Sequence, residues 1–283
     1  MVATDALEAD DAPLVDRSAD EPAPLGSMFK LYVLLAVAQA IETGELDWDT
    51  TLTVSAENRS LPSGELQELP DGTEVTVREA ATKMIEISDN TATDMLIQAL
   101  GREAIEDAVQ DAGHHDPELL SPFPSTREMF QLGWGAPEHL DTWQTGTKQE
   151  QRQLLDQLAH QPTDPQDVVV GGDPLWNQGV EWFASAHDVA SVHQALQDEQ
   201  DPIIREMLSR NPGVEQHAWD YVAFKGGSSP GVVTGSWFVE DATGESYVVV
   251  LLAATEDAAG ISADSQALFF RLANAAVELT SNV

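Results

Sequence analysis

Cysteine is absent from this 283-residue chain, which excludes disulfides, thiolate metal sites and cysteine nucleophiles. Positive charge is scarce, because 13 Lys and Arg residues stand against 49 Asp and Glu and give a formal charge of -36 at pH 7. Nucleic acids and anionic lipid surfaces attract Lys and Arg, so this charge argues against both as partners. Long apolar runs are also missing: the longest, Leu31 to Ile41, is far shorter than the roughly 20 residues of a membrane span. We therefore expect a protein that binds neither nucleic acid nor membranes.

The acidic residues are spread from Asp5 to Glu278 and are not gathered in one tail. That distribution is typical of a surface that is acidic all round, which we interpret as an adaptation to high salt. In molar salt the Debye length is roughly 3 Å, so repulsion between surface charges is screened. Because 42% of the residues are hydrophobic, the chain can still form a core, and we expect it to fold.

The first 23 residues are acidic and rich in proline and alanine, and we expect an extended arm there with at most one short edge strand. This segment lacks the basic start and apolar stretch of a secretory signal. We therefore expect a cytoplasmic protein, an expectation that a leader ahead of Met1 would change.

Helical patterns dominate the first three quarters of the chain. Residues 27–43 are apolar on nearly every helical face and are followed by Gly44, which predicts a central buried helix. Residues from about 45 to 215 predict a helical lobe, with a Gln-rich elaboration near residues 136–175. Two capping boxes mark helix starts in this lobe, Thr76 with Glu79 and Ser125 with Glu128.

The last quarter changes character, because Val-rich runs separated by Gly, Pro and Asp predict consecutive antiparallel strands. The runs cover residues 219–225, 231–240 and 247–255, and a helix-forming stretch, 263–280, closes the chain. This layout predicts an α/β (α+β) fold of two lobes, in which helices flank an antiparallel sheet. The sheet lobe would combine the N-terminal part of the chain with residues 216–283.

Ser27 and Lys30 are the first pair that indicates chemistry. Three residues apart on a helix, their Cβ atoms lie about 5–6 Å apart on one face, within range of a nucleophile and its base. The start of a helix stabilises the negative charge that develops when a hydroxyl attacks a carbonyl. The apolar surroundings of Lys30 lower the pKa of its ammonium and favour a neutral amine base. With eighteen serines and four lysines, however, chance alone produces a Ser-x-x-Lys about one time in four.

Ser88, Asp89 and Asn90 follow one helical segment and precede another. The Ser88 hydroxyl can pass on a proton, and the Asn90 amide can both donate to and accept from a substrate amide. A helix N-cap explains Asp89 or Asn90 as well, but it requires neither Ser88 nor this order of side chains.

Lys225 ends a predicted strand and is followed by Gly226, Gly227 and Ser228. Two glycines at a strand edge let a substrate backbone approach closely beside the cation. A phosphate-binding loop would open a helix, whereas another strand follows here. A plain glycine-rich hairpin is the alternative, and it gives no role to the lysine.

Only four lysines occur in the chain, and two of them complete these motifs in a consistent order. Ser-x-x-Lys, Ser-Asp-Asn and Lys-Gly-Gly in succession resemble the signature of class A β-lactamases and penicillin-binding proteins. The strings PLGSMFKLYVL, VREAATKMIEISDNTATDMLI, STREMF and FKGGSSPGV look like the branch that includes the β-lactamase-like protein of the clavulanic acid pathway. The resemblance covers about residues 24–280 and implies a single catalytic domain, 24–283, after an arm of residues 1–23.

This resemblance implies a serine hydrolase that forms an acyl-enzyme with a small-molecule substrate, a β-lactam or a related amide or ester. Ser27 would be the acylated nucleophile and Lys30 its base. Ser88 would carry a proton to the leaving nitrogen.

The same resemblance implies how substrate is bound. Asn90 would bind the substrate amide and Lys225 its carboxylate. Gly227 would let the substrate approach the strand, and the backbone amide of Ser228 would join that of Ser27 at the oxyanion. The seven histidines show no ligand spacing, so we expect no metal and no cofactor.

Two departures from the family pattern affect the expected activity. Gly226 stands where the family has Thr or Ser, which removes a hydroxyl that helps to hold a substrate carboxylate. Class A enzymes take their deacylating base from a Glu-x-x-x-Asn pattern in a loop beyond Ser-Asp-Asn. No such pattern lies between Asn90 and Lys225, and Glu118 is the only loop glutamate in about the right place. The alternatives are an esterase with the same site, a slowly deacylating β-lactam-binding or sensor protein, and a peptidase acting on peptidoglycan stems.

The charge predicts that folding depends on salt. We expect the helical circular dichroism signal to increase as KCl rises from dilute buffer to molar concentration, because screening weakens repulsion between surface carboxylates. A signal that stays flat across the salt series would contradict this interpretation of the acidic surface.

Overall fold

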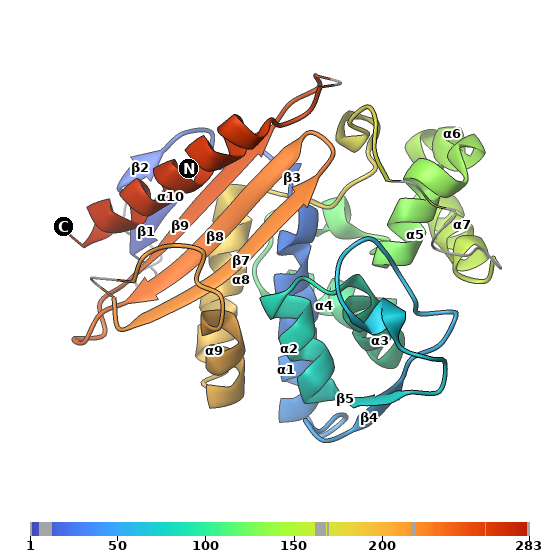
Figure 1. The fold of residues 1–283 in the computed structure, drawn as a ribbon, viewed down its shortest axis with the longest axis horizontal. Helices are drawn as coiled ribbons and strands as arrows, with labels where there is room; N and C mark the ends of the chain where they lie inside the picture. The colour runs from blue at the N-terminus through green and yellow to red at the C-terminus, as the bar shows by residue number, and fades with distance from the viewer. Residues whose placement is uncertain are drawn as a thin grey trace.

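The computed structural model describes residues 2–5, 13–161, 168, 170–216, 219–257 and 259–281 of the chain. It combines helices with antiparallel sheets, which confirms the predicted fold class (Figure 1). Within these ranges, no helix has both the length and the apolar character needed to cross a bilayer.

The main sheet has five antiparallel strands in the order β2-β1-β9-β8-β7. The predicted Val-rich runs form its three long strands, with the buried strand β8 between β7 and β9. The N-terminal segment contributes two further strands, so it extends the sheet beyond the expected arm; residues 6–12 lie outside the described ranges. The strands are β1 (Val2–Asp5), β2 (Val15–Asp16), β3 (Ala23–Pro24), β4 (Thr51–Thr53), β5 (Glu74–Thr76), β6 (Phe183–Ala184), β7 (Tyr221–Ser229), β8 (Val232–Glu240) and β9 (Ser246–Ala254).

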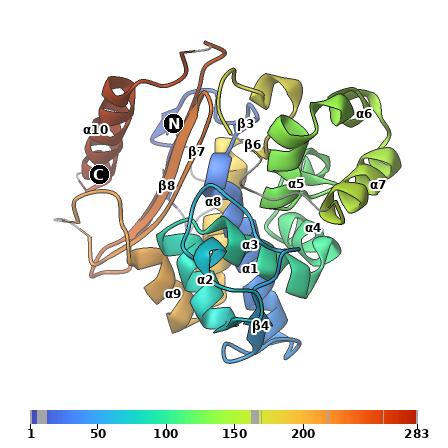
Figure 2. The same ribbon diagram turned by 45° about the vertical axis from the view of Figure 1, so that its right-hand side comes forward.

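The helices lie on both faces of this sheet. Helix α10 covers one face, while α8 and α9 lie against the other, with α1 and the remaining helices beyond them (Figure 2). The longer helices are α1 (Lys30–Glu42), α2 (Val77–Glu86), α3 (Asn90–Leu100), α4 (Arg102–Asp111), α7 (Lys148–Ala159), α8 (Ala186–Asp198), α9 (Pro202–Ser209) and α10 (Ala263–Thr280). The shorter ones are α5 (Thr126–Phe130) and α6 (Leu140–Thr145), with 3-10 or π turns η1 (Gly26–Phe29), η2 (Leu66–Glu68), η3 (Pro117–Leu120), η4 (Gln131–Gly135), η5 (Pro137–His139) and η7 (Trp176–Gln178).

Local sequence signals explain where several helices begin. The Thr76 side chain accepts a hydrogen bond from the Glu79 amide at the start of α2, and Ser125 and Glu128 form the complete predicted capping box of α5. Helix α1 is buried on nearly all sides, as its apolar sequence predicts, and ends before Gly44, whose φ is +77°.

Glycine allows η1 and β7 to come into backbone contact. A Cβ on Gly26, whose φ is +52°, would lie 2.7 Å from the Ser228 nitrogen. A Cβ on Gly227 would lie 2.2 Å from the Leu25 oxygen and 2.7 Å from the Ser27 nitrogen. Because these obstacles are backbone atoms, no rotamer change can relieve them. The two glycines therefore set the distance between the central helix and the sheet.

We expect Gly227→Ala to destabilise the protein by about 1–3 kcal/mol, because the added methyl group must push η1 away from β7. The measurement is the urea unfolding midpoint in molar KCl. Gly171→Ala is the matched control, since nothing lies within 4 Å of a Cβ built there. Equal midpoints for the two variants would show that the contact does not constrain the fold.

Candidate active site

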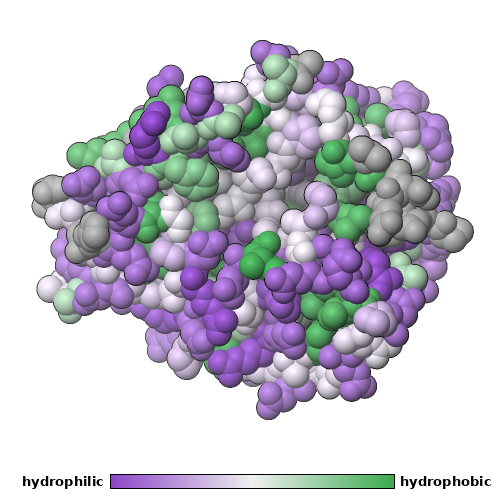
Figure 3. All heavy atoms as spheres, viewed as in Figure 1, coloured by the Kyte–Doolittle hydropathy of each residue, from purple (hydrophilic) through white to green (hydrophobic). Residues whose placement is uncertain are grey.

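Ser27 lies in η1, the turn that leads directly into α1, and its side chain is half-buried. It lines a cleft of about 660 Å³ between the β7 edge of the sheet and the helical lobe. Figure 3 shows a hollow near the middle of this face of the molecule. The glycine contacts described above bring the Ser27 and Ser228 backbone amides to the same end of the cleft.

Lys30 is the first residue of α1 and is completely buried. Its Nζ donates to the Ser88 carbonyl oxygen at 2.7 Å and to Asn90 Oδ1 at 2.7 Å, and it lies 3.1 Å from Ser88 Oγ. No hydrogen bond joins Lys30 to the Ser27 hydroxyl within the described ranges. The hydrogen-bond partners of Lys30 therefore come from the Ser-Asp-Asn loop, 58 to 60 residues further along the chain.

The surroundings of Lys30 favour a neutral amine. Burial lowers its pKa well below the usual value, and the charge of Lys225 lowers it further, whereas Asp94 and Asp89 oppose the shift. A neutral amine has two N–H bonds, which match its two short contacts at 2.7 Å. Its lone pair then remains available to accept a proton from a hydroxyl.

The Ser-Asp-Asn tripeptide is both a helix cap and part of the cleft. Asp89 is the N-cap of α3 and accepts from the Ala92 amide at 2.8 Å. Its other oxygen accepts from the Glu65 and Leu66 amides at 2.6 and 2.9 Å. Ser88 adopts a left-handed backbone with φ +59°, which is uncommon for serine. The cap thus holds the flanking Ser88 and Asn90 side chains toward Lys30.

Lys225 reaches the same place from β7. Its Nζ donates to the Gly226 carbonyl oxygen at 2.8 Å and to Ser88 Oγ at 3.2 Å. Burial lowers the pKa of Lys225 to about 7. The Ser88 hydroxyl therefore lies between two lysine nitrogens, one from α1 and one from β7.

The structure brings the seven predicted motif residues together and leaves one candidate out. Those that line the cleft are Ser27, Ser88, Asn90, Lys225, Gly227 and Ser228, and Lys30 lies beneath them. Glu118, the proposed deacylating base, is exposed on η3 and does not line the cleft. Its main-chain carbonyl instead accepts a hydrogen bond from Lys148 at 2.6 Å.

Two buried carboxyl groups near the site were not predicted from the sequence. Asp94 accepts hydrogen bonds from the Thr126 and Arg127 amides, and burial raises its pKa to about 7. Glu181 lines a small cavity beside Ser27. The only sequence signal for Glu181 is its position between the apolar residues Val180 and Trp182.

His114, His115 and Asp188 form the one group of possible metal-ligating side chains within the described ranges. Asp188 is the acidic member of the capping box of α8 and accepts from Ser185 and His115, while His114 Nδ1 accepts from the Asp116 amide at 3.1 Å. These contacts join the histidine loop to α8.

An antiparallel sheet beside a helical lobe, with Ser-x-x-Lys at the start of the central helix, defines the fold shared by serine β-lactamases and penicillin-binding proteins. A sequence model described as the Beta-lactamase enzyme family matches residues 2–279, and the chain belongs to this family. No curated protein matches the chain.

Solved structures show the same fold at low sequence identity. A β-lactamase from Sphaerobacter thermophilus has a TM-score of 0.64 at 23% identity and covers 98% of this chain and 90% of its own. A mutant of PBP-A, solved as an acyl-enzyme with penicillin G, has a TM-score of 0.62 at 18% identity, covering 98% and 89%. A β-lactamase from Burkholderia vietnamiensis has a TM-score of 0.63 at 14% identity, covering 98% and 88%.

We expect Lys225→Met to unfold at a higher temperature than wild type at pH 6, with a smaller gain at pH 9. Burial places the folded-state pKa of Lys225 near 7, below its usual 10.5. The cost of burying this side chain is therefore largest below pH 7 and declines as pH rises toward 10.5. Lys83→Met, at a half-buried lysine paired with Glu65, is the control for loss of a positive charge. A gain that is equal at both pH values would contradict the assignment.

Proposed function

We propose that this protein is a serine hydrolase that forms an acyl-enzyme on Ser27 with a β-lactam or a related amide or ester. The observation that carries this proposal is the buried Lys30 amine, which contacts Ser88 and Asn90 beneath a cleft lined by Ser27. Membership of the beta-lactamase enzyme family supports hydrolysis as the reaction. The same residues would serve an esterase, because acyl transfer from an ester or an amide uses the same groups.

Acylation begins when the Ser27 oxygen attacks the substrate carbonyl carbon. The neutral amine of Lys30 takes the hydroxyl proton, and the new C–O bond leaves a negative charge on the carbonyl oxygen. The backbone N–H groups of Ser27 and Ser228 stabilise that oxygen. When the C–N bond breaks, the Ser88 hydroxyl gives its proton to the leaving nitrogen and recovers one from Lys30, 3.1 Å away.

Lys225 favours a substrate that carries a carboxylate. A bound carboxylate would raise the pKa of Lys225 from its value of about 7 and keep the ammonium charged. Gly226 has no hydroxyl that could donate a second hydrogen bond to the substrate carboxylate. Binding of the carboxylate therefore depends mainly on the charge of Lys225. The weaker requirement for a carboxylate is compatible with uncharged esters as substrates.

A slowly deacylating binding or sensor protein is the second candidate. Among the described residues, Glu86 is the one acid that lines the cleft, and it forms an ion pair with Arg210 at 3.4 Å. Glu118 is exposed outside the cleft. Neither of these two carboxylates is placed to activate water at an acylated Ser27. A long-lived acyl-enzyme follows if the buried Glu181, which lines the small cavity beside Ser27, does not activate water either.

We expect intact-mass spectrometry in molar KCl to show wild-type protein gaining the mass of penicillin G, and Ser27→Ala gaining none. Free drug is followed in parallel: a transient adduct with drug consumed indicates a hydrolase, and a lasting adduct indicates the binding protein. Ser209→Ala, outside the cleft on α9, is the control for loss of a serine. Lys30→Ala should slow adduct formation by about 100-fold or more while the variant remains folded.

If wild type gives no adduct with penicillin G, the test is repeated with a p-nitrophenyl ester, which separates an esterase from a β-lactam hydrolase. An adduct that persists in Ser27→Ala would overturn the nucleophile assignment.

A further inference from the structure

Glu181 is a buried carboxyl group that the acylation steps above do not use. It lies between η7 and β6 and is 6% exposed. Its Oε2 accepts a hydrogen bond from Ser229 Oγ at 2.6 Å and its Oε1 accepts from the Trp182 amide at 3.1 Å. The Gly26 backbone N–H is a third donor beside this carboxyl group and lowers its pKa. A buried carboxyl group with three hydrogen-bond donors is held in one orientation.

Two of these donors stand next to the proposed oxyanion ligands. Gly26 precedes Ser27, and Ser229 follows Ser228, so one side chain contacts both segments that supply the oxyanion amides. The two segments are also in direct backbone contact. In addition, Thr234 Oγ1 donates a hydrogen bond to the Leu25 carbonyl oxygen at 2.6 Å. Two side chains therefore constrain the distance between the Ser27 and Ser228 amides. Thr234 does so from β8, and Glu181 from the segment between η7 and β6.

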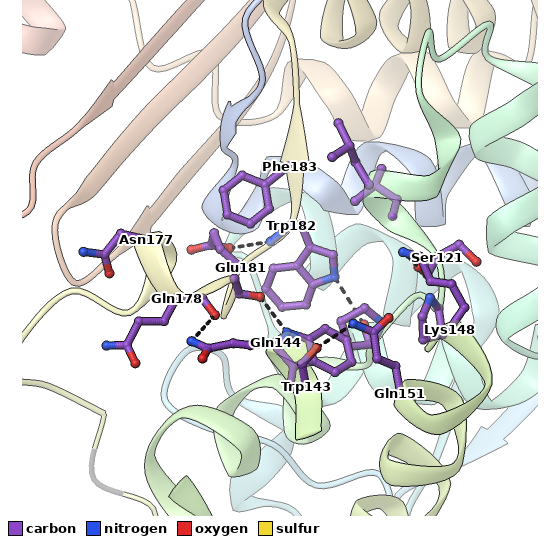
Figure 4. Close-up of a pocket in the computed structure, with 15 residues that line it drawn as sticks. Ser121, Trp143, Gln144, Lys148, Gln151, Asn177, Gln178, Glu181, Trp182 and Phe183 are labelled. Carbon is purple, nitrogen blue, oxygen red and sulfur yellow. Dashed lines mark hydrogen bonds between the residues drawn. The ribbon is translucent and has the colours of Figure 1, made fainter. Parts of the chain in front are cut away.

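Glu181 also separates two cavities. On one side, a cavity of about 20 Å³, large enough for one water molecule, is lined by Glu181 and Ser27. On the other side, a cavity of about 350 Å³ is lined by Glu181, Trp143 and Lys148 (Figure 4). The carboxyl group therefore borders a second cavity outside the substrate cleft.

We propose that Glu181 is a positioning residue of the oxyanion hole, holding Gly26 and Ser229 so that the Ser27 and Ser228 amides point at the same oxygen. This inference rests on the proposed acylation of Ser27. A misplacement of about 1 Å in such a donor can cost on the order of 100-fold in rate. Glu181 would then control the rate of acylation without touching the substrate.

The charge of Glu181 matters because it lies beside a developing anion. Burial raises its pKa to about 7, against the lowering effect of its three hydrogen-bond donors. An ionised carboxylate would oppose the oxyanion, so the neutral form favours acylation.

Among the described residues that line the two cavities, Lys148 is the one charged side chain besides Glu181, and the adjoining cleft adds Lys225 and Glu86. Lys225 on β7 is directed at Ser88, and Lys30 beneath the cleft at Ser88 and Asn90. Lys148 on α7 donates to the carbonyl oxygens of Glu118 and Ser121, and Glu86 pairs with Arg210. No lysine forms an ion pair with Glu181 within the described ranges, so no cation holds Glu181 in its charged form.

The test compares Glu181→Gln, Glu181→Ala and wild type in molar KCl. The rate of acylation by penicillin G, or by a p-nitrophenyl ester if that is the reacting probe, is followed by intact mass from pH 6 to pH 8.5. The affinity for phenylboronic acid is measured as well, because its tetrahedral adduct on Ser27 places an oxygen at the same amides. Glu128→Gln, at a buried glutamate that pairs with Arg102 outside the cleft, is the control for loss of a buried charge.

We expect Glu181→Ala to acylate about 10- to 100-fold more slowly and to bind the boronate more weakly at every pH. Glu181→Gln keeps the shape, its oxygen can accept from the Trp182 amide, and its NH2 group can donate to Ser229 Oγ as the OH of the neutral carboxyl group would, so it should match wild type at pH 6. Above pH about 7 it should acylate faster than wild type, because it cannot ionise. Lys225 also titrates near this pH, but it is present in both proteins, so the ratio of their rates isolates Glu181.

Acylation rates and boronate affinities equal to wild type in both variants would overturn the inference while leaving the proposed function intact. Normal acylation with a longer-lived adduct in Glu181→Gln would also overturn it, because Glu181 would then act on the deacylating water. Absence of any Ser27 adduct in wild type would instead reject the proposed function together with this inference.

Discussion

The burial of the Lys30 amine is the constraint on which the rest of the structure depends. A buried amine without partners would cost several kcal/mol, and the acceptors for Lys30 come from Ser88 and Asn90 on a separate loop. Asp89, between them, fixes that loop by capping α3. The side chains needed for chemistry are thus the same ones that hold the helical lobe against α1. The left-handed backbone of Ser88 shows that local conformational preference gives way to this requirement.

Charge is divided between the surface and the cleft. The chain carries a net charge of -36, yet two of its four lysines are buried at the cleft. Salt screens the long-range repulsion between surface carboxylates but has little effect on buried contacts such as those of Lys30 and Lys225. An acidic surface is therefore compatible with the two buried lysines at the cleft, as the proposed recognition of a carboxylate requires.

The oxyanion side of the cleft depends on segments that are far apart in the sequence. Gly26, Glu181 and Ser229 meet because two glycines allow η1 to touch β7. Short sequence spacing fixes the relative positions of Ser27 and Lys30, and of Lys225 and Gly227. The junction of Gly26, Glu181 and Ser229 is instead fixed by packing between elements. A single buried carboxyl group can influence the rate there because the backbone has no other freedom at the contact.

Local sequence signals were enough to predict the elements and the motif residues, because helix caps, apolar periodicity and short spacings act over a few positions. Helix α1, the long strands of the sheet and the order of Ser27, Ser88 and Lys225 follow from such signals. Three other features became visible in the folded chain alone: Lys30 contacts Ser88 and Asn90, Glu118 lies outside the cleft, and Glu181 lies beside Ser27. In a chain with 49 acidic residues, the sequence gives no reason to place any one glutamate in the interior. The folded structure shows that Glu181 is buried. The burial of a single charged side chain depends on contacts between distant segments, and no local pattern encodes it.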